Sequence, residues 1–416
     1  MRSVGTVSLG RASLGYAPIF ATRAKVFVAL LACVVLCSPA FGGYTVVDEH
    51  GPAYNRVNVV FMGDGYTADQ IETTYVTHIN LVLDHMFGES EEPFGRYANF
   101  FNIYRANVAS AESGADVPPL GIFRNTALDA SYYWDGSTER LLFVNPYKAM
   151  QARDAALAGS SIFPHISLVT VNDTRYGGGG DRRFAVCAGA NSFAPELALH
   201  EIGHAFSDLA DEYGDNDPNV VATYTGPEPG EVNVTISPTG EKWSHWLEYD
   251  QGSIGVVGAY EGARYYDEGL YRPSVTSKMR QLGQPFNAVC REKIIHDIYS
   301  IVSPIDAFLE GPEEEPLVDP QGLWVDLVDP DVLGVNWYVN GKLVPGADQE
   351  LFSLAAFGYG PGNYLVKARA FDATDWVRDS RGDLEQWVQW YVELTPEPGS
   401  AALLLCGALA ILRRRR

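Results

Sequence analysis

The segment that decides both fold and chemistry is Leu199-His-Glu-Ile-Gly-His-Ala-Phe-Ser-Asp-Leu-Ala-Asp-Glu-Tyr213. Apolar residues recur in it at helical spacing, and the preceding Ser192 and Pro195 suit a cap and a first turn, so it predicts a helix. His200 and His204 then lie one turn apart on one face, where two imidazole nitrogens can meet a single Zn²⁺ at about 2.1 Å. Glu201 lies beside them, where a carboxylate can take a proton from water and return it to a leaving amine.

A catalytic zinc needs a third protein ligand and an open position for water. Asp211 is the predicted third ligand, and Glu212 is the alternative directly after it. The acidic run from Asp211 to Asp217 also fits a solvated loop or a Ca²⁺ site. His245 is a more distant candidate ligand. The competing interpretation is a surface helix that carries His-Glu-x-x-His by chance, which is expected about once in a hundred chains of this length.

The chain around this segment falls into two parts of different character. In residues 44–308, apolar runs alternate with helical patterns, which predicts an α+β catalytic domain. Its predicted elements include a buried strand at 56–62, another strand at 167–171 and an amphipathic helix at 69–87. The acidic, proline-bearing segment 309–316 resists both helix and sheet and is the predicted linker.

Residues 317–395 contain short alternating strands and predict a small Ig-like β-sandwich. Asn340-Gly341 supplies the positive φ angles that a tight hairpin turn between two of these strands requires. The predicted strands lie at 334–339, 342–344, 363–370 and 385–393.

Both ends of the chain have the composition of targeting segments. Residues 1–43 combine basic residues, no acid and an apolar run at 26–37, which predicts a signal peptide; a membrane span needs about 20 apolar residues. Residues 396–416 join Pro-Glu-Pro to an apolar stretch and four arginines. This tail resembles the PEP-CTERM sorting signal of Gram-negative bacteria, which implies a membrane sorting enzyme as partner. A plain tail anchor is the alternative.

The charge of the chain favours an exported protein. It carries 30 Lys and Arg against 52 Asp and Glu, and without the eight basic residues of the two targeting segments its net charge is -30. This acidity argues against nucleic acid and anionic membrane as partners, and it suits a secreted protein that binds Ca²⁺. Cys187 and Cys290 lie outside the targeting segments, and they form either one disulfide or two buried thiols.

Several motifs are spread over most of residues 44–300. They are Val60-Phe-Met-Gly-Asp-Gly-Tyr-Thr67, Phe101-Asn-Ile-Tyr104, His200-Glu-x-x-His204 with Leu209-Ala-Asp-Glu-Tyr213, Tyr271-Arg-Pro273, Ser277-Lys-Met-Arg280 and Val289-Cys-Arg-Glu292. Together they resemble the bacterial IgA peptidase family of metzincin-like zinc peptidases.

The resemblance implies that His200 and His204 are zinc ligands, that Glu201 is the general base, and that an acidic residue after Leu209 is the third ligand. It also implies that Met279 lies beneath the metal, although the residues alone favour ordinary core packing for this side chain. Position 210, where the usual metzincin spacing puts a ligand, is Ala.

The sequence therefore predicts a secreted or surface-anchored zinc endopeptidase that acts on protein or peptide substrates. Tyr265, Tyr266 or Tyr271 is available to stabilise the oxyanion. The motif Asp64-Gly-Tyr-Thr67 is interpreted as a structural turn after a strand. Alternative functions are a surface adhesin with a degenerate metal site and a zinc amidase that acts on the cell wall.

Overall fold

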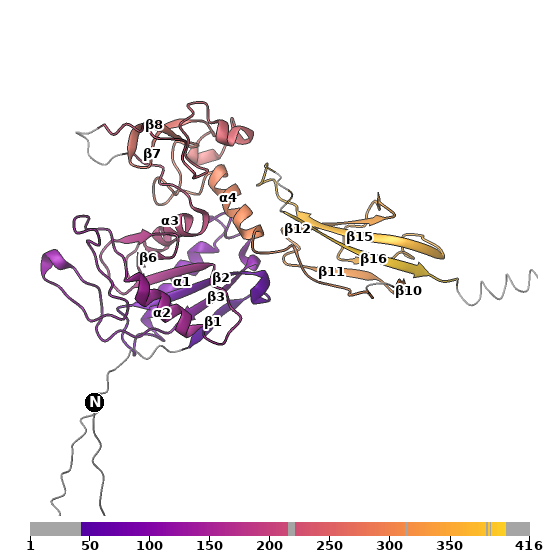
Figure 1. Ribbon diagram of the computed structural model, residues 1–416, viewed down its shortest axis with the longest axis horizontal. Helices are drawn as coiled ribbons and strands as arrows, with labels where there is room; N and C mark the ends of the chain where they lie inside the picture. Colours follow the sequence, from indigo (N-terminus) through magenta and orange to yellow (C-terminus); the bar gives the residue numbers. More distant parts are fainter. Residues whose placement is uncertain (1–42, 215–220, 313–314, 380–381, 383, 397–416) are drawn as a thin grey trace, which may run out of the picture. The chain divides into compact units, whose positions relative to one another are not determined.

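A computed structural model describes residues 43–214, 221–312, 315–379, 382 and 384–396 (Figure 1). The predicted signal peptide and sorting tail fall outside these residues, apart from Gly43 and Pro396. The helices are α1 (Thr74–Met86), α2 (Pro146–Ala156), α3 (Ala194–Ser207) and α4 (Ala288–Tyr299). Short 3₁₀ helices are η1 (Ala53–Asn55), η2 (Ala98–Phe100), η3 (Pro118–Leu120), η4 (Glu241–Trp246) and η5 (Gly252–Ile254). In the described residues no helix combines the length and apolar character needed to cross a membrane.

The first part of the chain is built on a six-stranded sheet with the strand order β1-β3-β2-β4-β6-β5. Its strands are β1 (Tyr44–Glu49), β2 (Val57–Asp64), β3 (Phe101–Ala106), β4 (Ile166–Val171), β5 (Gly178–Gly180) and β6 (Ala185–Ala188). The four inner strands are parallel, and β1 and β5 pair in antiparallel fashion at the two edges. Parallel strands are normally covered on both faces, and β2 is buried along its whole length.

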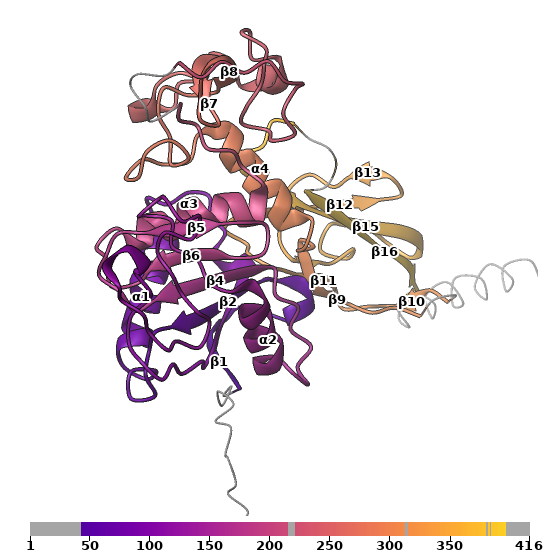
Figure 2. The same cartoon turned by 60° about the vertical axis from the view of Figure 1, so that its left-hand side comes forward.

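Helices cover both faces of this sheet because successive side chains of a strand point to opposite sides. Val59 and Phe61 of β2 belong to one core cluster together with α1, α3 and α4, whereas Met62 belongs to another that includes three alanines of α2. α3 and α4 lie side by side (Figure 2). Helix α3 therefore packs against both the sheet and α4.

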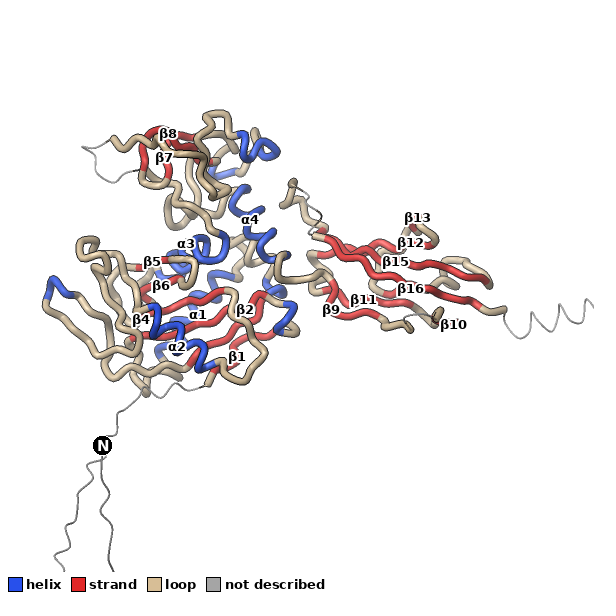
Figure 3. The backbone as a smooth tube through the Cα atoms, in the orientation of Figure 1, coloured by secondary structure: helices blue, strands red, loops and turns tan. Residues whose placement is uncertain are grey.

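The stretch between α3 and α4 consists largely of loops around one hairpin (Figure 3). The hairpin strands are β7 (Tyr260–Ala263) and β8 (Tyr266–Arg272), joined by Arg264 and Tyr265. Both linking residues have positive φ angles, 51° and 64°, although neither is Gly. Non-glycine residues adopt this conformation only when the surrounding structure enforces it, so the hairpin fixes the position of Tyr265.

The C-terminal part is a two-sheet β-sandwich. Its strands are β9 (Ile305–Phe308), β10 (Leu317–Val318), β11 (Leu323–Leu327), β12 (Leu333–Val339), β13 (Lys342–Leu343), β14 (Leu351–Phe352), β15 (Gly362–Asp372) and β16 (Glu385–Leu394). One sheet has the order β10-β16-β15-β12-β13 and the other β14-β11-β9. Trp337 stacks on Phe352 and on Trp390, at centroid distances of 4.9 and 5.4 Å, and forms the centre of the sandwich core.

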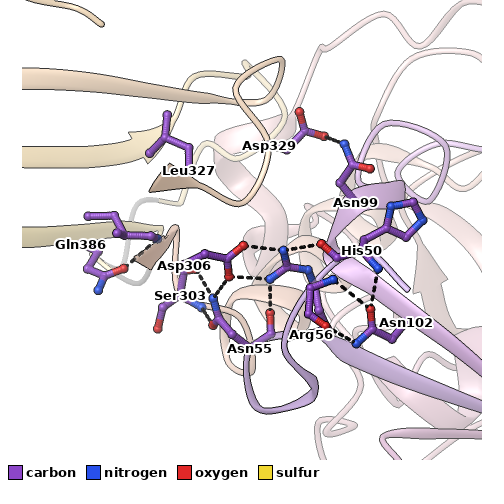
Figure 4. A network of polar contacts seen from close by, with 12 residues as sticks. His50, Asn55, Arg56, Asn99, Asn102, Ser303, Asp306, Leu327, Asp329 and Gln386 are labelled. Carbon is purple, nitrogen blue, oxygen red and sulfur yellow. Dashed lines mark hydrogen bonds and ion pairs between the residues drawn. The ribbon is translucent and has the colours of Figure 1, made fainter. Parts of the chain in front are cut away.

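Strand β9 lies inside the range predicted for the catalytic domain, yet it pairs with β11 of the sandwich. The predicted linker 309–316 therefore follows the first sandwich strand, and part of it lies outside the described residues. Arg56 directly precedes β2, and its buried guanidinium donates hydrogen bonds to Asp306 of β9 at 2.7 and 2.5 Å (Figure 4). Asn99 also donates to Asp329 at 3.0 Å (Figure 4). Buried polar contacts thus connect the two parts.

Most predicted elements are present, with two corrections. The predicted helix 69–87 begins only at Thr74, because the preceding residues form turns in which the Gln70 side chain accepts from Thr67 N and Asn172 Nδ2. Ser192 was predicted as the cap of α3, but the N-cap residue is Phe193, which offers no capping side chain. The tight turn at Asn340-Gly341 is confirmed, since both residues have positive φ angles and join β12 to β13.

Candidate metal centre

Helix α3 presents His200 and His204 on one face. Residues four apart on a helix point in the same direction, and the Nε2 atoms of these two imidazoles lie 3.2 Å apart. Their rings are nearly perpendicular, with centroids 4.8 Å apart. The predicted juxtaposition of the two histidines is therefore present in the structure.

The chain reverses direction directly after α3. Asp208 adopts a left-handed conformation with φ 51°, and its N–H donates to the carbonyl of His204 at 3.2 Å. The N–H of Leu209 then donates to the carbonyl of Gly203 at 3.1 Å. Left-handed residues commonly end helices in this way, and the reversal brings the following residues back toward the histidines.

Asp211 is the residue that reaches the histidines after this reversal. The side chain of Asn233 holds the segment in place, because it accepts from Ala210 N at 2.9 Å and donates to Ala210 O at 2.8 Å. Asp211 Oδ1 lies 3.1 Å from His200 Nε2 and 3.2 Å from His204 Nε2. The backbone of Ala210 is thus tied to Asn233, and the next side chain enters the site.

The imidazole protons point away from the meeting point of these three side chains. His200 Nδ1 lies 2.9 Å from the carbonyl oxygen of Lys278, and His204 Nδ1 lies 2.6 Å from that of Leu209. Because a carbonyl only accepts, each Nδ1 donates, and a neutral ring then has a lone pair on Nε2. Asp211 Oδ1 is buried, and its nearest polar neighbours are the two Nε2 atoms. Three ligand atoms within 4.8 Å of one another thus fit a divalent cation.

The electrostatics of the site favour a positive charge. Burial lowers the pKa of His204, but the hydrogen bond to Asp211 and its charge outweigh this effect and raise the pKa to about 9. Burial raises the pKa of Asp211, but the two imidazoles outweigh this effect and hold it well below its usual range. The carboxylate therefore remains ionised and available to a cation.

Glu201 lies beside the three ligand atoms, and its side chain is buried. Burial raises the pKa of its carboxyl group, against the lowering influence of the two histidines. A carboxylate whose pKa moves toward neutrality is a better proton acceptor at that pH. A Cβ atom at Gly180 of β5 would lie 2.6 Å from Glu201 Oε2. Any side chain at position 180 would therefore displace the glutamate.

Met279 packs against the helix segment that carries the histidines. It is fully buried, and a Cβ atom at Gly203 would lie 2.8 Å from its sulfur. The absence of a side chain at Gly203, between the two histidines in sequence, is what admits Met279 to this position.

Glu212, the alternative third ligand, points into a different environment. Its carboxylate is fully buried and accepts from Ser277 Oγ at 2.7 Å, Asn233 Nδ2 at 2.9 Å and Asn287 Nδ2 at 2.8 Å. Burial raises its pKa, and these hydrogen bonds lower it in part. Glu212 therefore connects the loop after α3 to the segment before Met279 and to the start of α4, and its oxygens are not directed at the histidines.

Two cavities adjoin the candidate metal centre and share part of their lining. One has a volume of about 800 Å³ and the other about 710 Å³, and both are lined by Gly180, His204, Asp211 and Tyr265. Glu201 lines the larger one. The side chains of His204 and Asp211 therefore lie where the two cavities adjoin.

The other residues singled out in the sequence take different positions. His245 is hydrogen-bonded to Glu292 at 2.6 Å and does not approach the two histidines of α3. Among the three tyrosines, Tyr265 donates to Asp211 Oδ2 at 2.8 Å, Tyr266 lines the smaller cavity, and Tyr271 is not among the lining residues of either. The acidic run 211–217 lies partly outside the described residues, so its interpretation as a Ca²⁺ site stays a prediction.

Asp64 and the two cysteines have structural environments. Asp64 is fully buried and accepts from the N–H groups of Leu128 and Ala130 at 2.9 and 2.8 Å, in agreement with a structural turn. Cys187 and Cys290 are both free and buried, so the alternative of two buried thiols holds.

A buried ion-pair network behind the histidines was not expected from the sequence. The Lys278 ammonium is completely buried and lies 2.9 Å from Glu91 and 2.6 Å from Glu196, and His85 lies 3.1 Å from Glu196. Because an ammonium group already occupies this acidic cluster, it is an ion-pair network. It anchors the residue whose carbonyl orients His200.

Glu196 makes the stability of this network depend on pH. Burial raises its pKa, but hydrogen bonds from His85 and Lys278 outweigh this effect and lower it from 4.5 to about 2. Because the pKa of the folded state lies below that of the unfolded chain, the stabilisation is complete above about pH 4.5 and is lost as the pH falls toward 2. Glu196→Gln is expected to reduce the free energy of unfolding at neutral pH by about 2 kcal/mol and to weaken its dependence on pH in this window.

Denaturant unfolding at several pH values measures both effects. Glu89→Gln, at an exposed position, is the control that should change neither quantity. A Glu196→Gln protein that keeps the full acid dependence of the parent would show that other groups cause it.

The comparison with known families identifies the chain. The family model described as IgA peptidase M64 matches residues 46–254 and 249–298, more than half of the chain, and these ranges include α3, the β7–β8 hairpin and Met279. No curated protein matches the chain. IgA peptidases M64 are metallopeptidases, in agreement with the three convergent ligand atoms. The chain belongs to the IgA peptidase M64 family.

Proposed function

We propose that this protein is an exported zinc endopeptidase in which His200, His204 and Asp211 hold the metal and Glu201 is the general base. The observation that carries the proposal is the convergence of two Nε2 atoms and one carboxylate oxygen beside a buried glutamate. Two imidazoles and one carboxylate are a ligand set that catalytic Zn²⁺ uses, with a further position for water. Two cavities adjoin this point, as the binding of an extended peptide requires.

The proposed reaction is hydrolysis of a peptide bond by water. When bound, zinc supplies a Lewis acid that activates water and polarises the scissile carbonyl. Glu201 accepts a proton from the attacking water and delivers it to the leaving nitrogen. Its burial keeps bulk water from competing for that proton, and Gly180 leaves room for its carboxylate.

Tyr265 is the proposed donor to the oxyanion that develops on the scissile carbonyl. Its hydroxyl donates to Asp211 Oδ2 at 2.8 Å, which brings it to the edge of the metal centre. The side chain is 48% exposed, so it can turn toward a substrate while the hairpin keeps its backbone fixed.

Tyr265→Phe is expected to lower kcat by about 100-fold, because one oxyanion donor contributes on this order. KM should stay close to that of the parent, and so should zinc content when zinc is present in excess, because the variant loses a hydrogen bond to Asp211 but no ligand. Peptide hydrolysis and metal analysis measure these quantities, and Tyr271→Phe, which lines neither cavity, is the control. Unchanged kcat would rule out this role for Tyr265.

The function is tested with the purified full chain, loaded with zinc, on casein and on peptidoglycan. Cleavage of casein that a strong chelator abolishes and added zinc restores is the expected result. Release of peptidoglycan fragments without casein cleavage would favour the cell-wall amidase. Zinc binding without hydrolysis of either substrate would favour the adhesin with a degenerate metal site.

Separate observations support export, a metzincin-like catalytic domain and an Ig-like sandwich. The signal-like segment 1–43 and the PEP-CTERM-like tail 396–416 support export and processing by a membrane sorting enzyme. The helix with two histidines, the chain reversal at Asp208 and the contact of Met279 with Gly203 support a metzincin-like domain. The two facing sheets support an Ig-like sandwich, which would position substrate or tether the enzyme at the surface.

A further inference from the structure

We propose that the larger cavity contains a subsite for a carboxylate, and that the enzyme prefers substrates with an Asp or Glu side chain close to the scissile bond. The proposal names a substrate class for the same cleft and therefore rests on the proposed function. Arg140 and Arg280 would form the subsite.

The cations of the two cavities differ in how they are paired. In the smaller cavity, Arg182 lies 2.7 Å from Asp208 and Arg264 lies 3.6 Å from Glu231. Arg140 and Arg280 line the larger cavity, and among the described residues neither has a carboxylate within ion-pair distance. The chain has 52 acidic residues against 30 basic ones, so two unpaired arginines in one cavity are not explained by a shortage of acids.

The backbone of each arginine is hydrogen-bonded to a segment next to the metal centre. The carbonyl of Arg140 accepts from the N–H of Gly178 at 3.1 Å, at the edge strand β5 that also contacts Glu201. The N–H of Arg280 donates to the carbonyl of Ser277 at 3.0 Å, one residue after Met279. The backbone of both arginines is therefore fixed, and both residues line the same cavity as Glu201.

The surroundings of these groups increase their affinity for an anion. A guanidinium has five N–H donors. Arg280 uses one for the carbonyl of Glu212 at 3.2 Å, and the Arg140 side chain is hydrogen-bonded to Tyr213, so both keep donors for a ligand. The cavity wall includes the apolar side chains of Leu141, Leu197 and Leu282, which strengthen charge interactions by excluding water.

A side-chain carboxylate suits this cavity better than the C-terminal carboxylate of a substrate. The second cavity adjoins the first at Gly180, His204, Asp211 and Tyr265, so the space beside the metal centre extends beyond the cavity that holds the two arginines. An exopeptidase normally closes one side of its cleft around the chain terminus. The geometry therefore points to an acidic side chain within a longer peptide.

The test uses peptides that differ only in Glu, Gln or Lys at the positions flanking the scissile bond, each with a free and an amidated C-terminus. The zinc-loaded full chain should show kcat/KM about tenfold higher for Glu than for Gln, with Lys lowest and the amide without effect. Arg140→Gln and Arg280→Gln should bring the Glu/Gln ratio toward one, and Arg140→Glu should favour Lys. Arg183→Gln, paired with Asp181 and outside both cavities, is the control that keeps the ratio.

Binding measurements separate this proposal from the proposed function. Calorimetry with the inactive Glu201→Gln protein should show tighter binding of the Glu peptide than of the Gln peptide, and Arg140→Gln in that background should remove the difference. Three results would overturn the subsite. They are equal kcat/KM for the Glu and Gln peptides, an unchanged Glu/Gln ratio in both arginine variants, and a preference only for peptides with a free C-terminus. Failure of the parent to cleave any peptide would overturn the proposed function, whereas equal affinities in calorimetry would still overturn the subsite.

Discussion

Glu201→Gln is expected to reduce kcat by about 10³- to 10⁴-fold while the protein keeps its zinc. The amide has nearly the shape of the carboxylate, but it cannot accept the proton of the attacking water. A positioned general base contributes on the order of 10²- to 10⁴-fold, and in the proposed mechanism the same group also returns the proton to the leaving nitrogen. The metal ligands are unchanged, because Glu201 is not among the three convergent atoms.

The measurement compares kcat on a casein-derived peptide with zinc content and thermal unfolding of the same preparation. Loss of activity with one zinc per chain and an unaltered unfolding temperature is the expected combination. If the variant keeps more than about a tenth of the parent's kcat, another group accepts the proton. Loss of zinc together with activity would instead place Glu201 among the ligands.

Asp211→Ala and Glu212→Gln are expected to have opposite consequences, although the two carboxylates are adjacent in sequence. Asp211→Ala removes one of the three proposed ligands and should weaken zinc binding by about 100-fold or more, since even the loss of a residue behind a ligand costs 10- to 100-fold. Glu212→Gln should keep zinc but reduce the free energy of unfolding by about 2 to 3 kcal/mol. The new NH₂ group would face the donors of Asn233 or Asn287.

Competition with a chelator measures zinc affinity, and urea unfolding in the presence of the chelator measures stability without metal. The expected pattern is a metal defect in one variant and a stability defect in the other. The reverse pattern would assign Glu212 as the ligand. Equal effects in both variants would mean that the loop after α3 acts as one unit.

The parts of the site that follow from local geometry were predictable from the sequence. The juxtaposition of His200 and His204 requires only a helix and a spacing of four residues. In the sandwich, the turn at Asn340-Gly341 was also predictable from local sequence, because the two turn residues alone determine it. The resemblance to the IgA peptidase family rested on short motifs between Val60 and Glu292. The match of residues 46–254 and 249–298 to IgA peptidase M64 confirms it.

The parts that depend on distant contacts were not predictable with the same certainty. Asp211 and Glu212 are chemically alike, and what separates them is the reversal at Asp208 and the hydrogen bonds of Asn233. No local pattern in the sequence indicated that Asn233 would contact this loop. The network around Lys278 joins residues nearly 190 positions apart, and no signal in either segment indicates the pairing.

The same limit explains the differences at the boundaries of elements. Helix α1 begins late because the Gln70 side chain bonds to Asn172, about a hundred residues away. Strand β9 was assigned to the wrong side of the linker because its partner β11 follows that linker in the chain. Pairing across a linker has no signature in the linker's own composition.

The two buried thiols determine how this protein can be produced and stored. Burial raises the pKa of the Cys187 thiol to about 12 and that of Cys290 well above its usual value, so neither is a thiolate at neutral pH. Only thiolates attack disulfides or are readily oxidised. In the described part of the chain, maturation therefore needs no oxidoreductase, and a reductant that does not bind zinc should leave the unfolding temperature unchanged when added to a storage buffer.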